Sequence, residues 1–173
     1  MKQQNFEIAV AQSNIHWTGR KVTGSHYGTV NLKRGNLTVA GNRLEAGKFV
    51  VDATSIKILD IADPAANAQF ASHLASDDFF GIALFPEASF EITSVHNNHI
   101  EGNLTIKGIT HPVRFDADIT ITGDTLKAAG KIVIDRTLYG IRFRSGSFFK
   151  NLGDTLIYDD FDLNVNITAK AAA

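Results

Sequence analysis

The chain has 173 residues, a length that favours a single domain able to bury its own core. It contains no cysteine, which excludes disulfides, zinc–thiolate sites, iron–sulfur clusters and cysteine nucleophiles. The formal net charge is −1 and no basic block occurs, so we expect no nucleic-acid partner.

No stretch approaches the roughly 18 consecutive apolar residues of a membrane-spanning helix, so we expect no transmembrane segment. Residues 1–5 lack the apolar region of a signal peptide. Localisation is left open: the protein is periplasmic if a signal peptide was removed, and cytoplasmic if the chain is complete as given.

Apolar and polar residues alternate along most of the chain, beginning with Phe6, Ile8 and Val10 on one face. This period of two predicts antiparallel strands with one buried and one solvated face. The alternation continues, in chain order, at residues 15–17, 37–39, 49–51, 90–94, 100–106, 113–121, 132–134 and 161–167.

Short clusters of Gly, Asn and Asp separate these segments and predict tight turns. They lie at residues 34–36, 41–42, 97–98, 123–124 and 153–154. The spacing predicts about eight strands in a meander, either as a barrel or as a sandwich.

Residues 63–74 break the alternation and predict one short helix. Asp63 is a good N-cap, Pro64 suits the first turn, and Phe70 and Leu74 are four residues apart on one face. A turn or a second short helix is expected at residues 76–80.

Motifs for catalysis or metal binding are weak. His96 and His99 flank a predicted hairpin tip without a recognisable third ligand, so we expect no metal site and no cofactor. Ser25 and His26 are adjacent in a strand and therefore point to opposite faces. No nucleophile elbow, phosphate loop or dinucleotide fingerprint occurs, which predicts a protein that is not an enzyme. A barrel enzyme that uses His26 or His73 with a carboxylate is the minor alternative.

The chain has 12 phenylalanines, and they come from many segments. They form either a packed core or the lining of an apolar cavity, because a barrel of about eight strands either just fills or holds one small ligand. The adjacent pairs Phe79–Phe80 and Phe148–Phe149 raise a further alternative, an interaction module, including a possible homodimer.

Longer segments resemble the YceI-like family. The most specific are Leu-Thr-Ile-Lys-Gly-Ile-Thr-His-Pro at 104–112 and His-Leu-Ala-Ser-Asp-Asp-Phe-Phe at 73–80, with further matches at 15–28, 85–90 and 135–141. The resemblance covers about residues 14–169, and we treat 1–173 as one domain.

This resemblance implies an all-β fold: an eight-stranded antiparallel, lipocalin-like β-barrel with a short helical insert. It implies a bacterial protein that binds or carries, without catalysis, a long apolar ligand in the barrel interior. A polyisoprenoid, a prenylated quinone or a similar lipid would be the partner, and no catalytic residues are carried over from the family.

Within such a barrel the apolar half of each strand faces the ligand. The residues expected to line the interior are Phe49, Val51, Phe90, Ile92, Leu104, Ile106, Val113, Phe115 and Ile132, with Phe79, Phe80 and Phe85 near the mouth. Ser25, Arg136 and Tyr139 match family segments, either to hold a head group or to stabilise turns.

Overall fold

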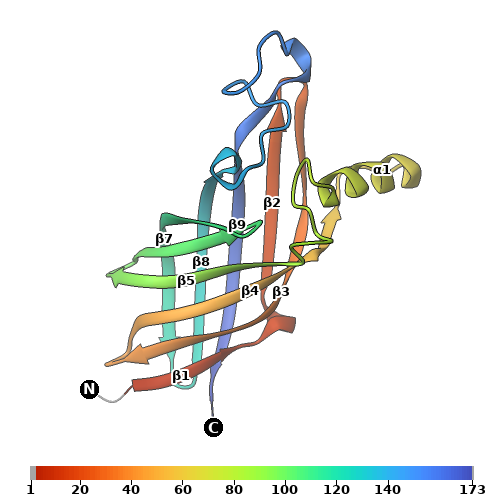
Figure 1. The fold of residues 1–173 in the computed structure, drawn as a ribbon. Helices are drawn as coiled ribbons and strands as arrows, with labels where there is room; N and C mark the ends of the chain where they lie inside the picture. The colour runs from red at the N-terminus through yellow and green to blue at the C-terminus, as the bar shows by residue number, and fades with distance from the viewer. Residues whose placement is uncertain (1–2, 173) are drawn as a thin grey trace.

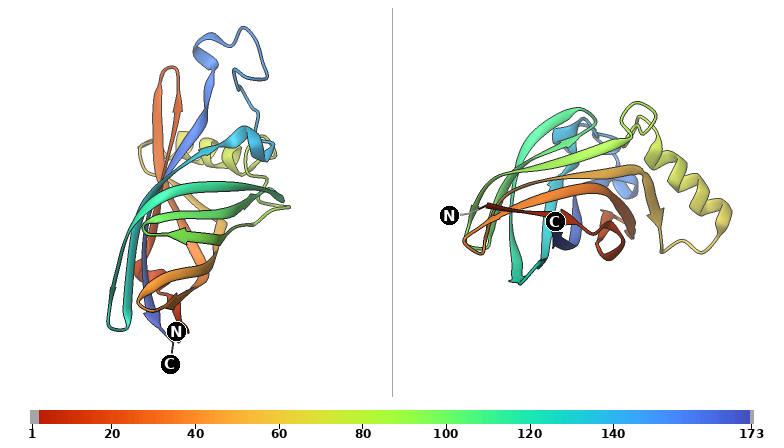
Figure 2. Two further views of the ribbon diagram at one scale, coloured as in Figure 1. Left: turned by 90° about the vertical axis from the view of Figure 1, so that its left-hand side faces the viewer. Right: turned by 90° about the horizontal axis from the view of Figure 1, so that it is seen from below.

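The computed structural model describes residues 3–172, in which one antiparallel sheet closes on itself as a barrel (Figures 1 and 2). Its strands are β1 (Gln3–Ile8), β2 (Asn14–Lys21), β3 (Gly24–Ala40), β4 (Arg43–Ile58), β5 (Glu87–His96), β6 (His99–Ile106), β7 (Ile109–Thr122), β8 (Thr125–Asp135) and β9 (Ile157–Ala171). From β2 onward each strand pairs with the next, and β9 pairs back to β2, so eight strands complete the circle. The predicted eight-stranded barrel is confirmed.

Strand β1 lies end to end with β2 along the same edge of β3. Phe6 pairs with Leu37, and Ile15 pairs with Val30. Between them, the 3₁₀ turn η1 (Val10–Gln12) interrupts the strand, and both pieces also pair with β9. Phe6 and Ile8 are buried as the alternation predicts, but Val10 is 37% exposed because η1 turns it away from the core.

The predicted turn at residues 34–36 is wrong, because β3 continues through it. Gly35 pairs with Phe49 of β4, and a Cβ there would lie 2.6 Å from Cδ1 of Ile8 and 2.9 Å from the carbonyl oxygen of Lys48. Gly35 therefore allows close packing between strands and does not reverse the chain.

The other predicted turns have mixed outcomes. Those at 41–42, 97–98 and 123–124 connect β3 to β4, β5 to β6 and β7 to β8. The one at 153–154 lies in the 3₁₀ turn η3 (Gly153–Thr155) before β9, not in a hairpin. The β6–β7 turn at Lys107–Gly108 was missed, although both residues have positive φ.

Helix α1 (Pro64–Ala75) begins where the sequence predicts. Asp63 accepts a hydrogen bond from the amide of Ala66 at 3.0 Å, and Pro64 occupies the first turn. The helix projects from the side of the barrel (Figure 2), and the segment after it, residues 76–80, forms a turn. No helix between residues 3 and 172 has the length and apolar character to cross a bilayer.

The β2–β3 hairpin and the long connection from β8 to β9 rise together at one end of the barrel, which we call the mouth end (Figure 1). The connection begins with the 3₁₀ turn η2 (Arg136–Tyr139), and we call residues 141–156 the mouth loop. The chain termini lie at the opposite end (Figure 1).

Candidate functional site

A cavity of about 190 Å³, the mouth cavity, occupies the half of the barrel nearest the mouth end. Strand residues such as Trp17 and Phe161 form most of its wall. Phe70 and Leu74 of α1 complete the wall from the side, together with Phe80 of the following turn. Its surface is apolar almost throughout, because Arg and Lys residues in the wall contribute their aliphatic stems.

A second cavity of about 80 Å³, the inner cavity, lies deeper in the barrel and is also apolar. Three aromatic rings share its wall: the centroids of Phe49 and Phe90 are 5.8 Å apart, and those of Phe90 and Phe115 are 5.7 Å apart. Gly102 of β6 makes room for this row, since a Cβ at that position would lie 2.4 Å from Cζ of Phe90.

The two cavities meet at a ring of four side chains that we call the collar: Ile15, Val51, Leu104 and Leu163. The order of residues along the strands shows how the cavities are arranged. On β9, Ile157 and Phe161 line only the mouth cavity and Ile167 lines only the inner one, with Leu163 of the collar between them. The same order holds on β4 and β6, so the cavities follow one another along the barrel with the collar as their boundary.

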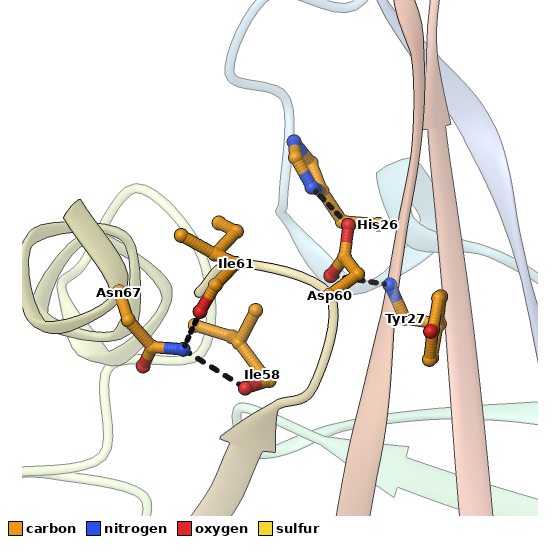
Figure 3. Close-up of polar contacts among 6 residues, drawn as sticks. All are labelled: His26, Tyr27, Ile58, Asp60, Ile61 and Asn67. Carbon is orange, nitrogen blue, oxygen red and sulfur yellow. Dashed lines mark hydrogen bonds and ion pairs between the residues drawn. The ribbon is translucent and has the colours of Figure 1, made fainter. Parts of the chain in front are cut away.

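We call the part of the mouth-cavity wall that α1 forms the helical wall. Polar contacts at its base attach it to the barrel (Figure 3). Nδ1 of His26 lies 2.8 Å from Oδ2 of Asp60, and the amide of Tyr27 donates to Oδ1 of the same carboxylate at 3.1 Å. The side-chain amide of Asn67 donates to the carbonyls of Ile58 and Ile61 at 2.9 and 3.1 Å. These contacts attach the β4–α1 linker to β3, and α1 to the linker.

Burial alone would raise the pKa of Asp60, but the hydrogen bonds from His26 and from the Tyr27 amide outweigh it and lower that pKa below its usual value. Asp60 is therefore a carboxylate under ordinary conditions, which suits its role as a double acceptor.

His26 and His73, which the alternative hypothesis of a barrel enzyme would use, both support the helical wall. The ring of His26 lies 4.8 Å from that of Phe70. The ring centroid of His73 lies 5.0 Å from that of Phe79 and 4.6 Å from that of Phe143, and its Nε2 is 3.0 Å from the Asp78 carboxylate. Each histidine thus combines one carboxylate with aromatic packing around α1.

The two arginines in the wall of the mouth cavity, Arg20 and Arg136, are occupied by the protein itself. Arg20 is paired with Asp162 and lowers the pKa of that carboxyl by hydrogen bonding. Arg136 is buried and donates to the carbonyls of Ile141, Ile157 and Tyr158, each at 3.0 Å. It therefore ties the start of the mouth loop to the start of β9.

The other two residues that match family segments, Tyr139 and Ser25, line neither cavity. Tyr139 is 1% exposed, its ring lies edge-on to His111, and burial raises its pKa to about 12. Ser25 is exposed on β3. Of the two readings left open for Arg136 and Tyr139, the geometry favours the stabilisation of turns.

At the predicted hairpin tip, His99 pairs with Asp116 at 3.0 Å and lies 3.6 Å from Glu101. Between residues 3 and 172 there is no group of three or more His, Asp or Glu side chains placed to hold a metal ion.

The predicted lining residues are distributed over both cavities. The mouth cavity has Val51, Phe79, Phe80, Leu104 and Ile106 in its wall, and the inner cavity has Phe49, Val51, Phe90, Ile92, Leu104, Val113, Phe115 and Ile132. Phe85 lies in neither wall, and its ring packs instead against Gly108. Contact of these residues with a ligand stays a prediction.

Several wall residues were missed although the sequence carried a signal for them. Trp17, Phe161 and Leu163 have the same alternation as the predicted lining. Phe70 and Leu74 share one face of the predicted helix. Ile141 and Ile157 had no periodic signal, because they lie at the two ends of the irregular mouth loop.

A family model described as a YceI-like domain matches residues 6–169. A UPF0312 protein of Staphylococcus aureus (strain bovine RF122 / ET3-1) is 42% identical over 79 residues, which are 42% of this chain and 46% of that protein. The matched stretch thus spans about half the length of this curated relative.

Solved structures with the same fold are more distant in sequence. BcnA of Burkholderia cenocepacia is 18% identical, with a TM-score of 0.70 over 94% of this chain and 99% of that one. A polyisoprenoid binding domain from Saccharophagus degradans, implicated in plant cell wall breakdown, is 11% identical, with a TM-score of 0.72 over 96% and 98% of the two chains. These likenesses extend over nearly the whole barrel.

Proposed function

Because this chain belongs to the YceI-like domain family, whose model spans residues 6–169, we propose that it binds and carries a long apolar ligand inside its barrel. The ligand is a polyisoprenoid, a prenylated quinone or a similar lipid. The observation that carries this proposal is the succession of two apolar cavities along one barrel, separated only by the collar.

Volume indicates how such a ligand would fit. A dry apolar cavity of about 150 Å³ accepts a molecule the size of benzene, and pockets for larger ligands measure roughly 300–1,000 Å³. The mouth cavity, at about 190 Å³, holds only the first part of a long tail. The remainder passes the collar into the inner cavity, so the side chains of Leu104 and its neighbours must move aside.

The head group of the ligand stays outside the barrel. The cavity surfaces are apolar, and the nearest strong donors, Arg20 and Arg136, are already engaged with Asp162 and with backbone carbonyls. Affinity therefore comes from the tail, at about 0.8 kcal/mol for each methylene buried, less the cost of ordering it. Selection is by tail length and width more than by head-group chemistry.

We further propose that the protein is not an enzyme. His26 and His73 each hold the helical wall in place, which accounts for their carboxylate partners without catalysis. The name of the Saccharophagus protein, a polyisoprenoid binding domain, supports the binding reading. A turnover by the purified protein that is lost in the single variants His26→Ala or His73→Ala would support the enzyme alternative and contradict this proposal.

Native mass spectrometry of the purified protein, followed by extraction into organic solvent and lipid analysis, tests the ligand. An added mass that the solvent removes, and that proves to be a long-chain lipid, supports the proposal. A matched pair of variants makes the test specific: Leu104→Trp fills the collar, and Val133→Trp adds the same ring on the outside of β8, where Val133 is 54% exposed. We expect Leu104→Trp to lose the added mass and Val133→Trp to keep it. Equal retention by both would contradict binding through the collar.

A further inference from the structure

The mouth loop carries an exposed surface that the ligand proposal does not use. Phe148 and Phe149 are 49% and 51% exposed, although they are adjacent large aromatic residues. Exposed aromatic pairs on a folded protein mark a contact surface.

The mouth loop that carries these rings also carries three cationic side chains. Arg142, Arg144 and Lys150 are all exposed on the mouth loop, against one acidic residue, Asp154. The chain as a whole has a formal net charge of −1, so the loop is locally cationic on a nearly neutral protein. The guanidinium of Arg142 lies 4.4 Å from the ring centroid of Phe148, which places a charge and an aromatic ring side by side.

The base of the loop is fixed, so this surface has a defined position. Ser145 and Ser147 donate to the two oxygens of Asp159 at 2.5 and 2.6 Å. The amide of Ile157 donates to the carbonyl of Arg144 at 2.9 Å. The amide of Val22, in the β2–β3 turn, donates to the carbonyl of Leu156 at 3.2 Å. The loop is thereby held beside the β2–β3 hairpin, and both stand beyond the strands at the mouth end (Figures 1 and 2).

We propose that the mouth loop docks on an anionic lipid bilayer, with Phe148 and Phe149 inserted at the interface and Arg142, Arg144 and Lys150 against the lipid head groups. Aromatic and cationic residues together are the composition of interfacial membrane contacts, because the rings enter the apolar boundary while the cations remain at the anionic surface. Ile141, the first residue of the loop, and Ile157, the residue after it, line the mouth cavity, so docking brings this end of the barrel to the bilayer.

A second copy of this chain fits the surface less well. A symmetric dimer through the same patch would set Arg142, Arg144 and Lys150 of one protomer against the same three cations of the other. Like charges brought together in this way oppose association, whereas an anionic bilayer is attracted by all three.

Cosedimentation with lipid vesicles tests the proposal. We expect the protein to bind vesicles of equimolar phosphatidylcholine and phosphatidylglycerol, to bind pure phosphatidylcholine far less, and to be released by high salt. Removing all three charges in R142Q/R144Q/K150Q should lower affinity about a hundredfold, at about fivefold for each cation. Replacing the rings in F148S/F149S should lower it about tenfold or more.

The control removes three exposed cations elsewhere on the barrel, in R43Q/K48Q/K127Q, with the same change of net charge. This variant should bind almost as well as the parent protein. Equal binding by both triple variants, or equal binding to both kinds of vesicle, would overturn the proposal. So would a dimer in solution that F148S/F149S dissociates, since the patch would then be an interface between copies.

The outcome is independent of the ligand proposal. A protein that binds vesicles but carries no lipid in native mass spectrometry counts against the ligand alone. A protein that carries lipid but ignores anionic vesicles counts against docking alone.

Discussion

The Asp60 carboxylate joins the base of the helical wall to β3 through its contact with His26, with 2.8 Å between Oδ2 and Nδ1. Asp60 lies two residues after the end of β4, and His26 lies near the start of β3. The pair therefore fixes the point where the chain leaves the barrel to form α1, and with it the position of Phe70 in the cavity wall.

Asp60→Asn tests this pair through the pH dependence of stability. The folded protein holds the pKa of Asp60 below its usual value, so the contribution of the carboxylate is present at neutral pH and is lost as pH falls through that lowered pKa. We expect the variant to be less stable by about 1–2 kcal/mol at neutral pH, with the difference shrinking in acid. Urea unfolding of both proteins from pH 7 downward measures it. Asp118→Asn, an exposed change on β7, is the control and should stay within about 0.5 kcal/mol.

Leu104→Ala should join the two cavities by opening the collar. In the lipid-free protein we expect a loss of about 2–5 kcal/mol, because a buried side chain leaves a void. The variant should also accept bulkier tails, measured by displacement of a fluorescent apolar dye with branched and linear alcohols. Ile167→Ala removes a comparable buried side chain of the inner cavity and should match the stability loss without the change in selectivity. The same selectivity in both variants would argue against the collar as the boundary.

Gly102→Ala should disturb the aromatic row of the inner cavity. The added Cβ would meet Cζ of Phe90 at 2.4 Å and the carbonyl oxygen of Glu91 at 2.5 Å, and the backbone atom cannot move aside cheaply. We expect destabilisation of about 1–3 kcal/mol. Gly19→Ala is the matched control, since a Cβ at Gly19 has no neighbour within 4 Å. Thermal unfolding of the two variants should differ by several degrees, and equal melting temperatures would contradict this account.

Arg136→Met should release the mouth loop while retaining the volume of the side chain. Its loss leaves the carbonyls of Ile141, Ile157 and Tyr158 without their donor, at a cost of about 2–4 kcal/mol. Trypsin should then cut within residues 142–150 faster than in the parent protein. Arg114→Met changes an arginine whose side chain is 74% exposed and should leave the cleavage rate unchanged.

The fold could be predicted because its signals are local and repeated. On β7, the alternation of Val113, Phe115 and Ala117 with Arg114 and Asp116 reproduces the inward and outward faces. Asp63 and Pro64 likewise define the start of α1 within a few residues. These patterns depend only on the period of the backbone and on cap chemistry.

The features that could not be predicted from the sequence are decided by tertiary contacts. Gly35 was interpreted as a turn residue because its local composition suits a turn, whereas the close approach of Ile8 from β1 requires a glycine inside a strand. Phe85 was placed near the cavity by its proximity to Phe79 and Phe80 in sequence, but its ring packs against Gly108 of the β6–β7 turn and lines neither cavity. The division of the interior into two cavities depends on how four strands bring their collar residues together, which no single segment encodes.

The closure of the barrel has a consequence for how the protein folds. The first two strands pair with the last one, β9. Phe6 of β1 pairs with Ala171, and Ile15 of β2 pairs with Val165. Contacts between residues this far apart in sequence form slowly, because a long stretch of chain must first be ordered between them. We therefore expect the sheet of β2 to β8 to have two unpaired edges until β9 has been synthesised and pairs with both. The barrel interior, with both of its cavities, is enclosed only when that last pairing forms.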